Sequence, residues 1–345
     1  MNTDKNTPYA GLTPDCVLDA LDSIGLRGDG RLLGLNSYEN RVYQIWLEEG
    51  PVLTSGPCPA SPVVVAKFYR PGRWSSEQIA EEHAFVGELA ERELPVVAPL
   101  AQDGKTLHEF GGYRFAVYPK RGGRAPELED RETLEWMGRF IGRIHAVGAL
   151  APFRARPALD RASFGVEPRD YLLAHGFIPA DLSAAWSSVA AQALEGVSRC
   201  YERAGAVKNL RLHGDCHAGN VLWVDSAEAH GPHFVDFDDA RMGPAVQDLW
   251  MLLSGERAAM TGQLLDVLEG YESFMDFDWR EVRLIEPLRT LRMIHHSAWI
   301  ARRWEDPAFP IAFPWFAGTS YWADQCTRLR EQIVAMAEPP LGSSA

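Results

Sequence analysis

The chain of 345 residues is 46% hydrophobic and 23% charged, with a formal net charge of −13 at pH 7. This composition is that of an ordinary soluble globular protein, and the length exceeds one ordinary core, so we expect two domains or lobes. The negative charge argues against nonspecific binding to nucleic acid or to an anionic membrane surface. Any anionic ligand would therefore have to be held by local cations and a metal ion.

The sequence carries no signal for a membrane or for an oxidising compartment. No apolar run reaches the length of a membrane span, and residues 1–10 lack the basic and then apolar pattern of a signal sequence. The five cysteines form neither a CxxC pair nor a regular framework, which predicts reduced thiols in the cytoplasm. Because nothing suggests a dedicated dimerisation element, we expect a monomer.

In the first third of the chain, the pattern predicts strands around one principal helix. A short helix that Thr13 caps is expected before them. Loop residues fill 50–62. The expected elements, in chain order, are a helix over 14–24, a hairpin over 31–47, a strand over 63–68, a helix over 74–93, and strands over 96–101 and 113–118.

After residue 119 the apolar pattern becomes helical, and we place a lobe boundary there. An aromatic loop broken by prolines is expected over 307–314. The expected helices are 131–147, 181–203, 245–254, 257–275 and 281–304. The sequence thus predicts a bilobal α+β fold, with an N-terminal lobe of mainly strands over 1–119 and a mainly helical C-terminal lobe over 120–345.

One stretch, Arg211-Leu-His-Gly-Asp-Cys-His-Ala-Gly-Asn220, concentrates polar side chains before an apolar run. Phosphoryl transfer needs an acceptor for the hydroxyl proton, oxygen ligands for Mg²⁺, and positive charge on the nucleotide phosphates. Asp215 can accept the proton, Asn220 offers a neutral carbonyl oxygen, and Asp236 on a second strand offers an anionic one. The Asp-x-x-x-x-Asn spacing matches the catalytic loop of protein kinases. No G-x-x-x-x-G-K-[ST] motif is present, which excludes P-loop NTPases.

Lys67 lies within a predicted strand and Glu82 on the apolar stripe of the next helix. The two match the lysine–glutamate pair that holds nucleotide phosphates in kinases. By strand alternation, Lys67 points the same way as Val63 and Val65. The alternatives are a lysine that protects an edge strand and a solvated helix acid, and Glu81 is not excluded as the partner.

The predicted phosphate loop lacks the glycines of the protein-kinase pattern, because Ser37 and Asn40 stand at two of those positions. A hydroxyl and an amide could replace some backbone contacts to phosphate, although close approach of the backbone becomes harder. Ser37 is the candidate at the ATP phosphates.

The His-Gly-Asp form of the loop resembles the aminoglycoside and choline phosphotransferase branch of the kinase-like fold. Nearly the whole chain is similar to the bacterial stress response kinase A family. The stretches that carry this similarity are NSYENRVY at 36–43, KFYRP at 67–71, HGDCHAGN at 213–220, GPAVQDLW at 243–250, IEPL at 285–288 and DPAFP at 306–310.

That resemblance implies a cytoplasmic serine/threonine protein kinase of the stress response, with ATP as co-substrate and Mg²⁺ as cofactor. It implies an aminoglycoside-phosphotransferase-like fold with the active site in the cleft between lobes. Asp215 would be the proton acceptor, Asn220 and Asp236 the Mg²⁺ ligands, with Asp236 also counted as catalytic. Ser37, Lys67 and Glu82 would bind the nucleotide. The partners would be protein substrates or the kinase itself, and neither nucleic acid nor a membrane.

Several residues near the motifs keep more than one interpretation. Asp238 and Asp239 could touch a second Mg²⁺ or be solvated acids after the strand. Asp248 could be a helix N-terminal acid or could hydrogen-bond the catalytic loop. Cys216 could be a redox sensor, but neighbouring carboxylates would raise the pKa of its thiol. Histidine pairs could suggest zinc, but no cysteine or acid cluster stands at ligand spacing.

Two rival functions remain. One is a kinase of a small alcohol or amine-bearing metabolite, whose cationic group would be bound by acids and aromatic rings near 299–322, with Trp304 to Asp306 and Trp315 as the best candidates. The other is a nucleotide-binding regulator without turnover, because the phosphate loop lacks its glycines.

Overall fold

The computed structural model describes residues 7–50, 61–226 and 230–342. The chain packs as two compact units. Unit 1 comprises residues 1–125 and 221–238, and unit 2 comprises residues 126–220 and 239–345. The predicted lobe boundary after residue 119 stays a prediction. Residues 51–60 of the predicted loop lie outside the described residues.

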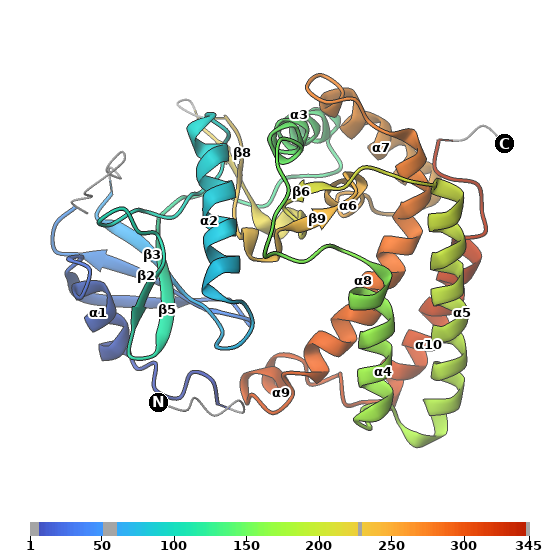
Figure 1. The fold of residues 1–345 in the computed structure, drawn as a ribbon, viewed down its shortest axis with the longest axis horizontal. Coiled ribbons are helices and arrows are strands. Elements are labelled where there is room, and N and C mark those ends of the chain that lie inside the picture. The colour runs from blue at the N-terminus through green and yellow to red at the C-terminus, as the bar shows by residue number, and fades with distance from the viewer. Residues whose placement is uncertain (1–6, 51–60, 227–229, 343–345) are drawn as a thin grey trace. The chain divides into compact units, whose positions relative to one another are not determined.

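Unit 1 is built on a five-stranded antiparallel sheet in the order β1-β2-β3-β5-β4 (Figure 1). The strands are β1 Gly28–Leu35, β2 Arg41–Leu47, β3 Val63–Phe68, β4 His108–Phe110 and β5 Tyr113–Pro119. The predicted hairpin and the strands at 63–68 and 113–118 are confirmed. The strand predicted over 96–101 is wrong, because Val96 makes only an isolated bridge, to Phe234. Pro99 lacks the N–H that a ladder needs at that point.

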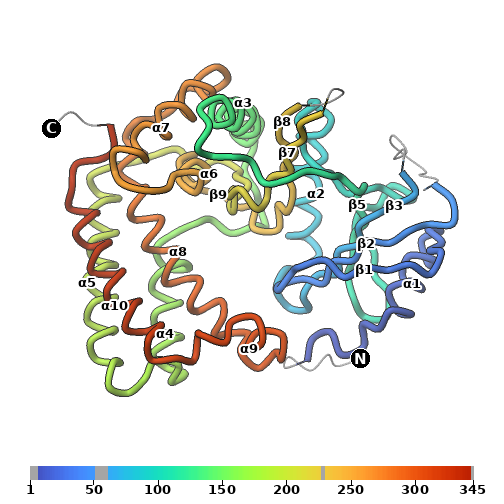
Figure 2. Tube along the Cα trace, turned by 180° about the vertical axis from the view of Figure 1, so that it is seen from behind, coloured from blue at the N-terminus to red at the C-terminus, as the bar shows by residue number. Residues whose placement is uncertain are grey.

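Helices cover both faces of this sheet (Figure 2). Helix α1, Pro14–Asp22, packs on the face that carries Val64 and Phe68, whereas Ile79 of helix α2, Ser76–Glu91, packs with Ala116. Lys67 lies opposite Ala116 in the β3–β5 register. Because strand side chains alternate between faces, Lys67 belongs to the face that α2 covers.

A hairpin from later in the chain also packs in unit 1. Its strands are β7, Val221–Asp225, and β8, His230–Phe234. The backbone of Trp223 exchanges two hydrogen bonds with that of Arg124, at 2.6 and 3.0 Å, and Val97 donates to the carbonyl of Phe234 at 3.0 Å. The 3₁₀ turn Phe237–Asp239 follows, and Phe237 meets Phe85 of α2 edge to face. These contacts bring Asp236 and Asp238 into the same unit as Lys67.

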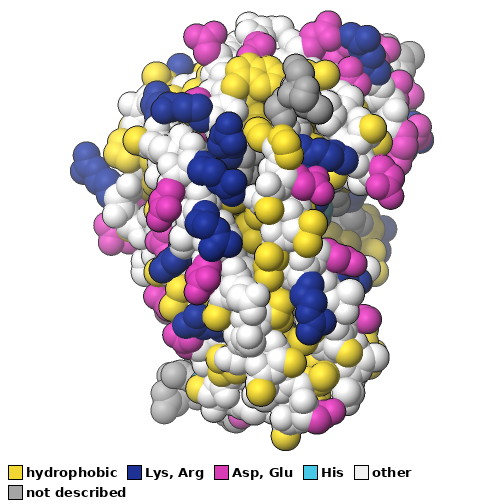
Figure 3. Space-filling model, turned by 90° about the vertical axis from the view of Figure 1, so that its right-hand side faces the viewer, with side chains coloured by type: hydrophobic (Ala, Val, Ile, Leu, Met, Phe, Trp, Pro, Cys, Tyr) yellow, Lys and Arg dark blue, Asp and Glu magenta, His cyan; other side chains and the backbone are white. Residues whose placement is uncertain are grey.

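Unit 2 is mainly helical, and α5 packs against both α8 and α10 (Figures 1 and 2). The outer face of α5 and α10 carries acidic, basic and apolar side chains interspersed (Figure 3). The helices are α3 Arg131–Gly148, α4 Glu167–Ala174, α5 Ala180–Ala204, α6 Val246–Trp250, α7 Arg257–Tyr271, α8 Ile285–Ala301, α9 Ala308–Ala312 and α10 Thr319–Ala335, with a π-helical turn at Ala162–Val166 and a 3₁₀ turn at Trp279–Leu284.

The predicted helices of unit 2 are confirmed, whereas the loop predicted over 307–314 contains α9. Just before this helix, the carboxylate of Asp306 accepts a hydrogen bond at 3.1 Å from the backbone N–H of Ala308, its first residue. Pro310 lies in its first turn, where a missing N–H costs little. The prolines therefore start this segment as a helix instead of breaking it.

Two features of unit 2 position the loop of residues 213–220. Strand β6, Leu210–Leu212, pairs antiparallel with β9, Arg241–Gly243. Helices α3 and α7 cross closely at Gly138, where an added Cβ would overlap the carbonyl oxygen of Val267. The loop begins at the end of β6 and ends with the 3₁₀ turn Ala218–Asn220.

Candidate active site

In unit 1, the ammonium group of Lys67 is buried among carboxylates. The residue is only 6% exposed, and its Nζ lies 2.8 Å from Asp236 Oδ1 and 3.1 Å from Asp238 Oδ1. Burial alone lowers the pKa of Lys67, but Asp236, Asp238 and Glu82 together raise it well above its usual value. The lysine is therefore a fixed positive charge on the α2 face of the sheet.

The structure distinguishes the two candidate glutamates of α2. Glu82 is buried and Glu81 is half-buried. The negative charge of Glu82 is among those that raise the pKa of Lys67. The orientation predicted from the helical period is thus confirmed, and the role of Glu82 in nucleotide binding stays a prediction.

Asp238, left without a role by the sequence, lies at the centre of a buried polar cluster. Its carboxylate pairs with Lys67 and with Arg73, and it accepts a hydrogen bond from Asn40 Nδ2 at 3.2 Å. A buried carboxylate needs such partners to offset its desolvation. Asp238 is therefore an internal counter-ion in this structure, and it holds Lys67 together with Asp236.

The loop between β1 and β2 contains Ser37, which is half-buried, and Asn40, which is buried. The amide of Asn40 is engaged at both ends, since its Oδ1 accepts from the backbone N–H of Arg70 at 3.1 Å while its Nδ2 donates to Asp238. Asn40 thus braces the loop from inside, which corrects the idea that its amide replaces a glycine contact to phosphate. The role of Ser37 stays a prediction.

In unit 2, the backbone of the loop 213–220 is clamped by Asp248 of α6. This buried carboxylate accepts hydrogen bonds from the backbone N–H groups of His213 and Gly214, each at 2.8 Å, and lies 3.0 Å from His145 Nε2. Gly214 has a φ of 85°, and a Cβ there would overlap the carbonyl oxygen of Asp239. Of the two interpretations for Asp248, the structure shows the hydrogen bonds to the loop.

Asp215 follows this clamped backbone and is surrounded by donors and cations. Asn220 Nδ2 donates to its carbonyl oxygen at 2.9 Å and to Oδ2 at 3.3 Å, while His217 Nε2 lies 3.5 Å from Oδ2. Arg292 Nη1 lies 2.5 Å from Oδ1. Burial raises the pKa of Asp215, but the hydrogen bond from His217 and the charge of Arg292 lower it to about 2. The group is a carboxylate at neutral pH.

The two predicted metal ligands each keep an oxygen that suits Mg²⁺. The amide of Asn220 is oriented by its donated hydrogen bonds, and among the described residues none donates to its Oδ1. Asp236 has a φ of 60°, and its side chain is 52% exposed although Oδ1 contacts Lys67. A non-glycine residue in this left-handed region stores backbone strain, which is typical of functional sites.

The parts of the chain that the structure describes contain no group of three or more His, Cys, Asp and Glu side chains arranged for a metal. Magnesium in nucleotide sites uses one or two protein ligands, with phosphate oxygens and waters completing the octahedron. Each of the two oxygens, taken by itself, is of the kind that Mg²⁺ binds, and the assignment of Asn220 and Asp236 as ligands stays a prediction.

Cys216 is buried, and the pKa of its thiol is raised well above the usual value by burial and by Asp248 and Asp215. The thiolate that oxidation requires is thus disfavoured. The sequence also predicted a raised pKa for this thiol, and a raised pKa argues against a redox sensor beside Asp215.

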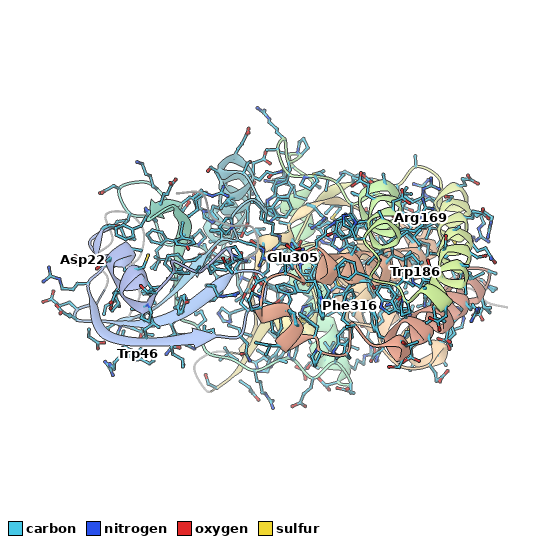
Figure 4. The ribbon with its side chains drawn as sticks, turned by 90° about the horizontal axis from the view of Figure 1, so that it is seen from below. Asp22, Trp46, Arg169, Trp186, Glu305 and Phe316 are labelled. Atoms are coloured by element: carbon cyan, nitrogen blue, oxygen red, sulfur yellow. The ribbon has the colours of Figure 1, made fainter. Side chains whose placement is uncertain are left out.

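The aromatic group near 299–322 packs mostly inside unit 2. Phe316 and Trp186, both labelled in Figure 4, each contact Trp322, at ring distances of 5.3 and 5.9 Å. Trp304 packs on Phe316 at 5.2 Å, while Trp315 is 45% exposed. The predicted core role is confirmed for Phe316 and Trp322, and Trp315 keeps an accessible ring.

Within the described ranges, no helix combines the length and apolar character that crossing a bilayer requires.

Comparison with known proteins places this chain in a family. Residues 32–285 match the phosphotransferase enzyme family. Stress response kinase A of Salmonella choleraesuis is 45% identical over 338 residues, which cover 98% of this chain and 98% of that protein. A protein named serine/threonine protein kinase RdoA, from Salmonella typhimurium, has the same identity and coverage. Stress response kinase A of Escherichia coli is 45% identical over 333 residues, covering 96% of each chain.

Solved structures show the same fold at low sequence identity. An amicoumacin kinase in complex with AMP-PNP, Ca²⁺ and Ami has a TM-score of 0.69 at 18% identity, covering 95% of this chain and 94% of that one. A microcompartment-associated aminopropanol kinase has a TM-score of 0.67 at 19% identity, covering 93% and 98%. The predicted α+β, aminoglycoside-phosphotransferase-like fold is confirmed. The chain belongs to the phosphotransferase enzyme family and, within it, to the group of the stress response kinase A proteins.

Proposed function

We propose that this protein is an ATP- and Mg²⁺-dependent serine/threonine protein kinase of a stress response. Its family membership supports phosphoryl transfer. One observation carries the choice of a protein hydroxyl as acceptor: a relative that is 45% identical along 98% of the chain is named a serine/threonine protein kinase. We further propose that it acts in the cytoplasm.

Asp215 is the proposed proton acceptor. Its carboxylate is ionised at neutral pH, and its Oδ1 is a buried atom without an aligned hydrogen bond in the described structure, although Arg292 lies close to it. The serine or threonine O–H gives its proton to Asp215 as its oxygen bonds to the γ-phosphorus. The bond from that phosphorus to the bridging oxygen breaks, and ADP leaves. Asp248 holds the loop, so catalysis relies on a pre-positioned charge.

Lys67 is the proposed cation for the nucleotide phosphates, with Glu82 helping to keep it protonated and Ser37 at the phosphate loop. Asn220 and Asp236 would hold Mg²⁺, which supplies neutralising charge for the phosphates when it is bound. Support for ATP and a divalent ion comes from the amicoumacin kinase, whose structure contains AMP-PNP and Ca²⁺.

The small-molecule rival has support from the fold, since the structural neighbours are named as kinases of small molecules. Their identity to this chain is 18% and 19%, which carries no information on the acceptor. The regulator without turnover is disfavoured by Asp215, which is held in place and ionised. An assay that follows the phosphoryl group separates all three functions.

The test uses radiolabelled ATP with a cell extract from which small molecules have or have not been removed. We expect label in protein bands, and we expect Asp215→Ala to abolish it while calorimetry still detects ATP binding. Asp324→Ala, an exposed acid on α10, is the matched control and should retain full turnover. Label only in the metabolite fraction would overturn the protein acceptor, and absence of ATP consumption would favour the regulator.

A further inference from the structure

The carboxylate of Asp215 is paired with an arginine that has no role in the proposed phosphoryl transfer. Arg292 of α8 lies 2.5 Å from Asp215 Oδ1, and its side chain is 40% exposed. The other carboxylate oxygen, Oδ2, already faces Asn220 Nδ2 and His217 Nε2. A substrate hydroxyl must therefore approach Oδ1, and it meets a guanidinium there.

The acids near Asp215 do not offset this positive charge for a ligand. Asp239, which also acts on the Asp215 carboxylate, is paired with Arg241 at 2.6 Å. Asp306 is buried, and its carboxylate accepts a hydrogen bond from the backbone N–H of Ala308. Of the two carboxylates that the sequence suggested for a cationic acceptor, Asp306 is thus turned into the fold, whereas Glu305 is exposed.

Two aromatic rings, those of Trp299 on α8 and Tyr171 on α4, are likewise covered by the chain's own cations. Arg303 lies over the ring of Trp299 at 5.2 Å, and Arg302 lies over that of Tyr171 at 5.0 Å. Arg292 and Trp299 are seven residues apart and share one side of α8, and Arg303 lies just after the end of that helix. A cationic ligand would have to compete with these arginines for the rings.

We propose that Arg292 is a specificity-determining residue that selects serine or threonine hydroxyls flanked by an aspartate or glutamate in the substrate protein. This inference rests on the proposed function. When the hydroxyl reaches Asp215 Oδ1, the guanidinium leaves that oxygen and takes the neighbouring substrate carboxylate, which can accept two parallel hydrogen bonds from it. A lysine or arginine at the same substrate position is repelled.

The test compares three synthetic peptides that share one serine and differ only in flanking residues, which are glutamates, alanines or lysines. For the native enzyme with Mg-ATP, we expect kcat/KM for the glutamate peptide to exceed that for the lysine peptide by about tenfold or more, mainly through KM. Arg292→Ala should bring the two values together, and Arg292→Glu should reverse their order. The ratio between peptides is independent of any common loss of turnover or of folded enzyme.

Arg330→Glu, at an exposed position of α10, makes the same change of charge away from Asp215 and should keep the native ratio. Equal rates on the acidic and basic peptides with native enzyme, or an unchanged ratio in Arg292→Ala, would overturn the inference while Asp215-dependent peptide phosphorylation upholds the proposed function. If Asp215-dependent transfer occurs only to small molecules, both fail.

Discussion

Replacing Asp248 tests how much of the site depends on the loop clamp. Its buried carboxylate accepts from two backbone N–H groups, those of His213 and Gly214, and lies 3.0 Å from His145 Nε2. A buried donor left without a partner costs about 1–3 kcal/mol, so the two backbone groups alone give about 2–6 kcal/mol. We expect Asp248→Ala to lower the free energy of unfolding by about 4 kcal/mol.

Asp248→Asn changes the hydrogen bonds while keeping nearly the same side-chain volume, so it tests the hydrogen bonds alone. Its amide oxygen can still accept from one backbone N–H, whereas its NH₂ group faces the other donor, so we expect a loss of about 2 kcal/mol. Because the loop carries Asp215, both variants should lower kcat far more than they change the KM for ATP.

Urea unfolding gives the stability change, and hydrogen exchange at the amides of His213 and Gly214 reports the clamp directly. Both amides should exchange faster in each Asp248 variant. Asp324→Ala, on the exposed face of α10, should stay within about 0.5 kcal/mol of the native protein. An Asp248→Ala protein that loses less than about 1 kcal/mol, with both amides still protected, would show that the clamp has little energetic weight.

Three further changes follow from the structure. Asp236→Ala should remove the Mg²⁺ dependence of ATP binding, which calorimetry with and without the metal measures; retained dependence would exclude Asp236 as a ligand. Burial raises the pKa of Glu281 to about 7, so the folded state keeps a proton that the unfolded chain releases. Stability should therefore fall by about 3 kcal/mol as pH rises from 4.5 through 7, and Glu281→Gln should flatten this slope in urea unfolding at pH 5 and 8; an unchanged slope would refute the assignment. Gly138→Ala should destabilise the α3–α7 crossing by about 3 kcal/mol in thermal unfolding, because its Cβ overlaps the carbonyl of Val267, and native stability would contradict this packing.

Several electrostatic partners of the candidate residues came only from the tertiary structure. Asn40 and Asp238 are 198 residues apart in the chain, yet their side chains are hydrogen-bonded. Arg292 gave no sequence signal, since an arginine on an amphipathic helix is ordinarily solvated. Which charge opposes a carboxylate depends on how separate elements pack, and local pattern does not encode that packing.

The sequence by itself determined the features that depend on local chemistry. Strand alternation placed Lys67 on the correct face, the helical period favoured Glu82 over Glu81 without excluding Glu81, and the Asp-x-x-x-x-Asn motif singled out Asp215 and Asn220. It failed at Pro99 and Pro310, where the effect of a proline depends on its position in the element. Tertiary structure alone decided that Asp238 is a buried counter-ion and that Asp248 clamps the loop. Charge pairs between distant segments become strong only when they are buried, because the interior screens them less than water does. A residue is buried only after the chain has folded, so local sequence does not reveal these pairs.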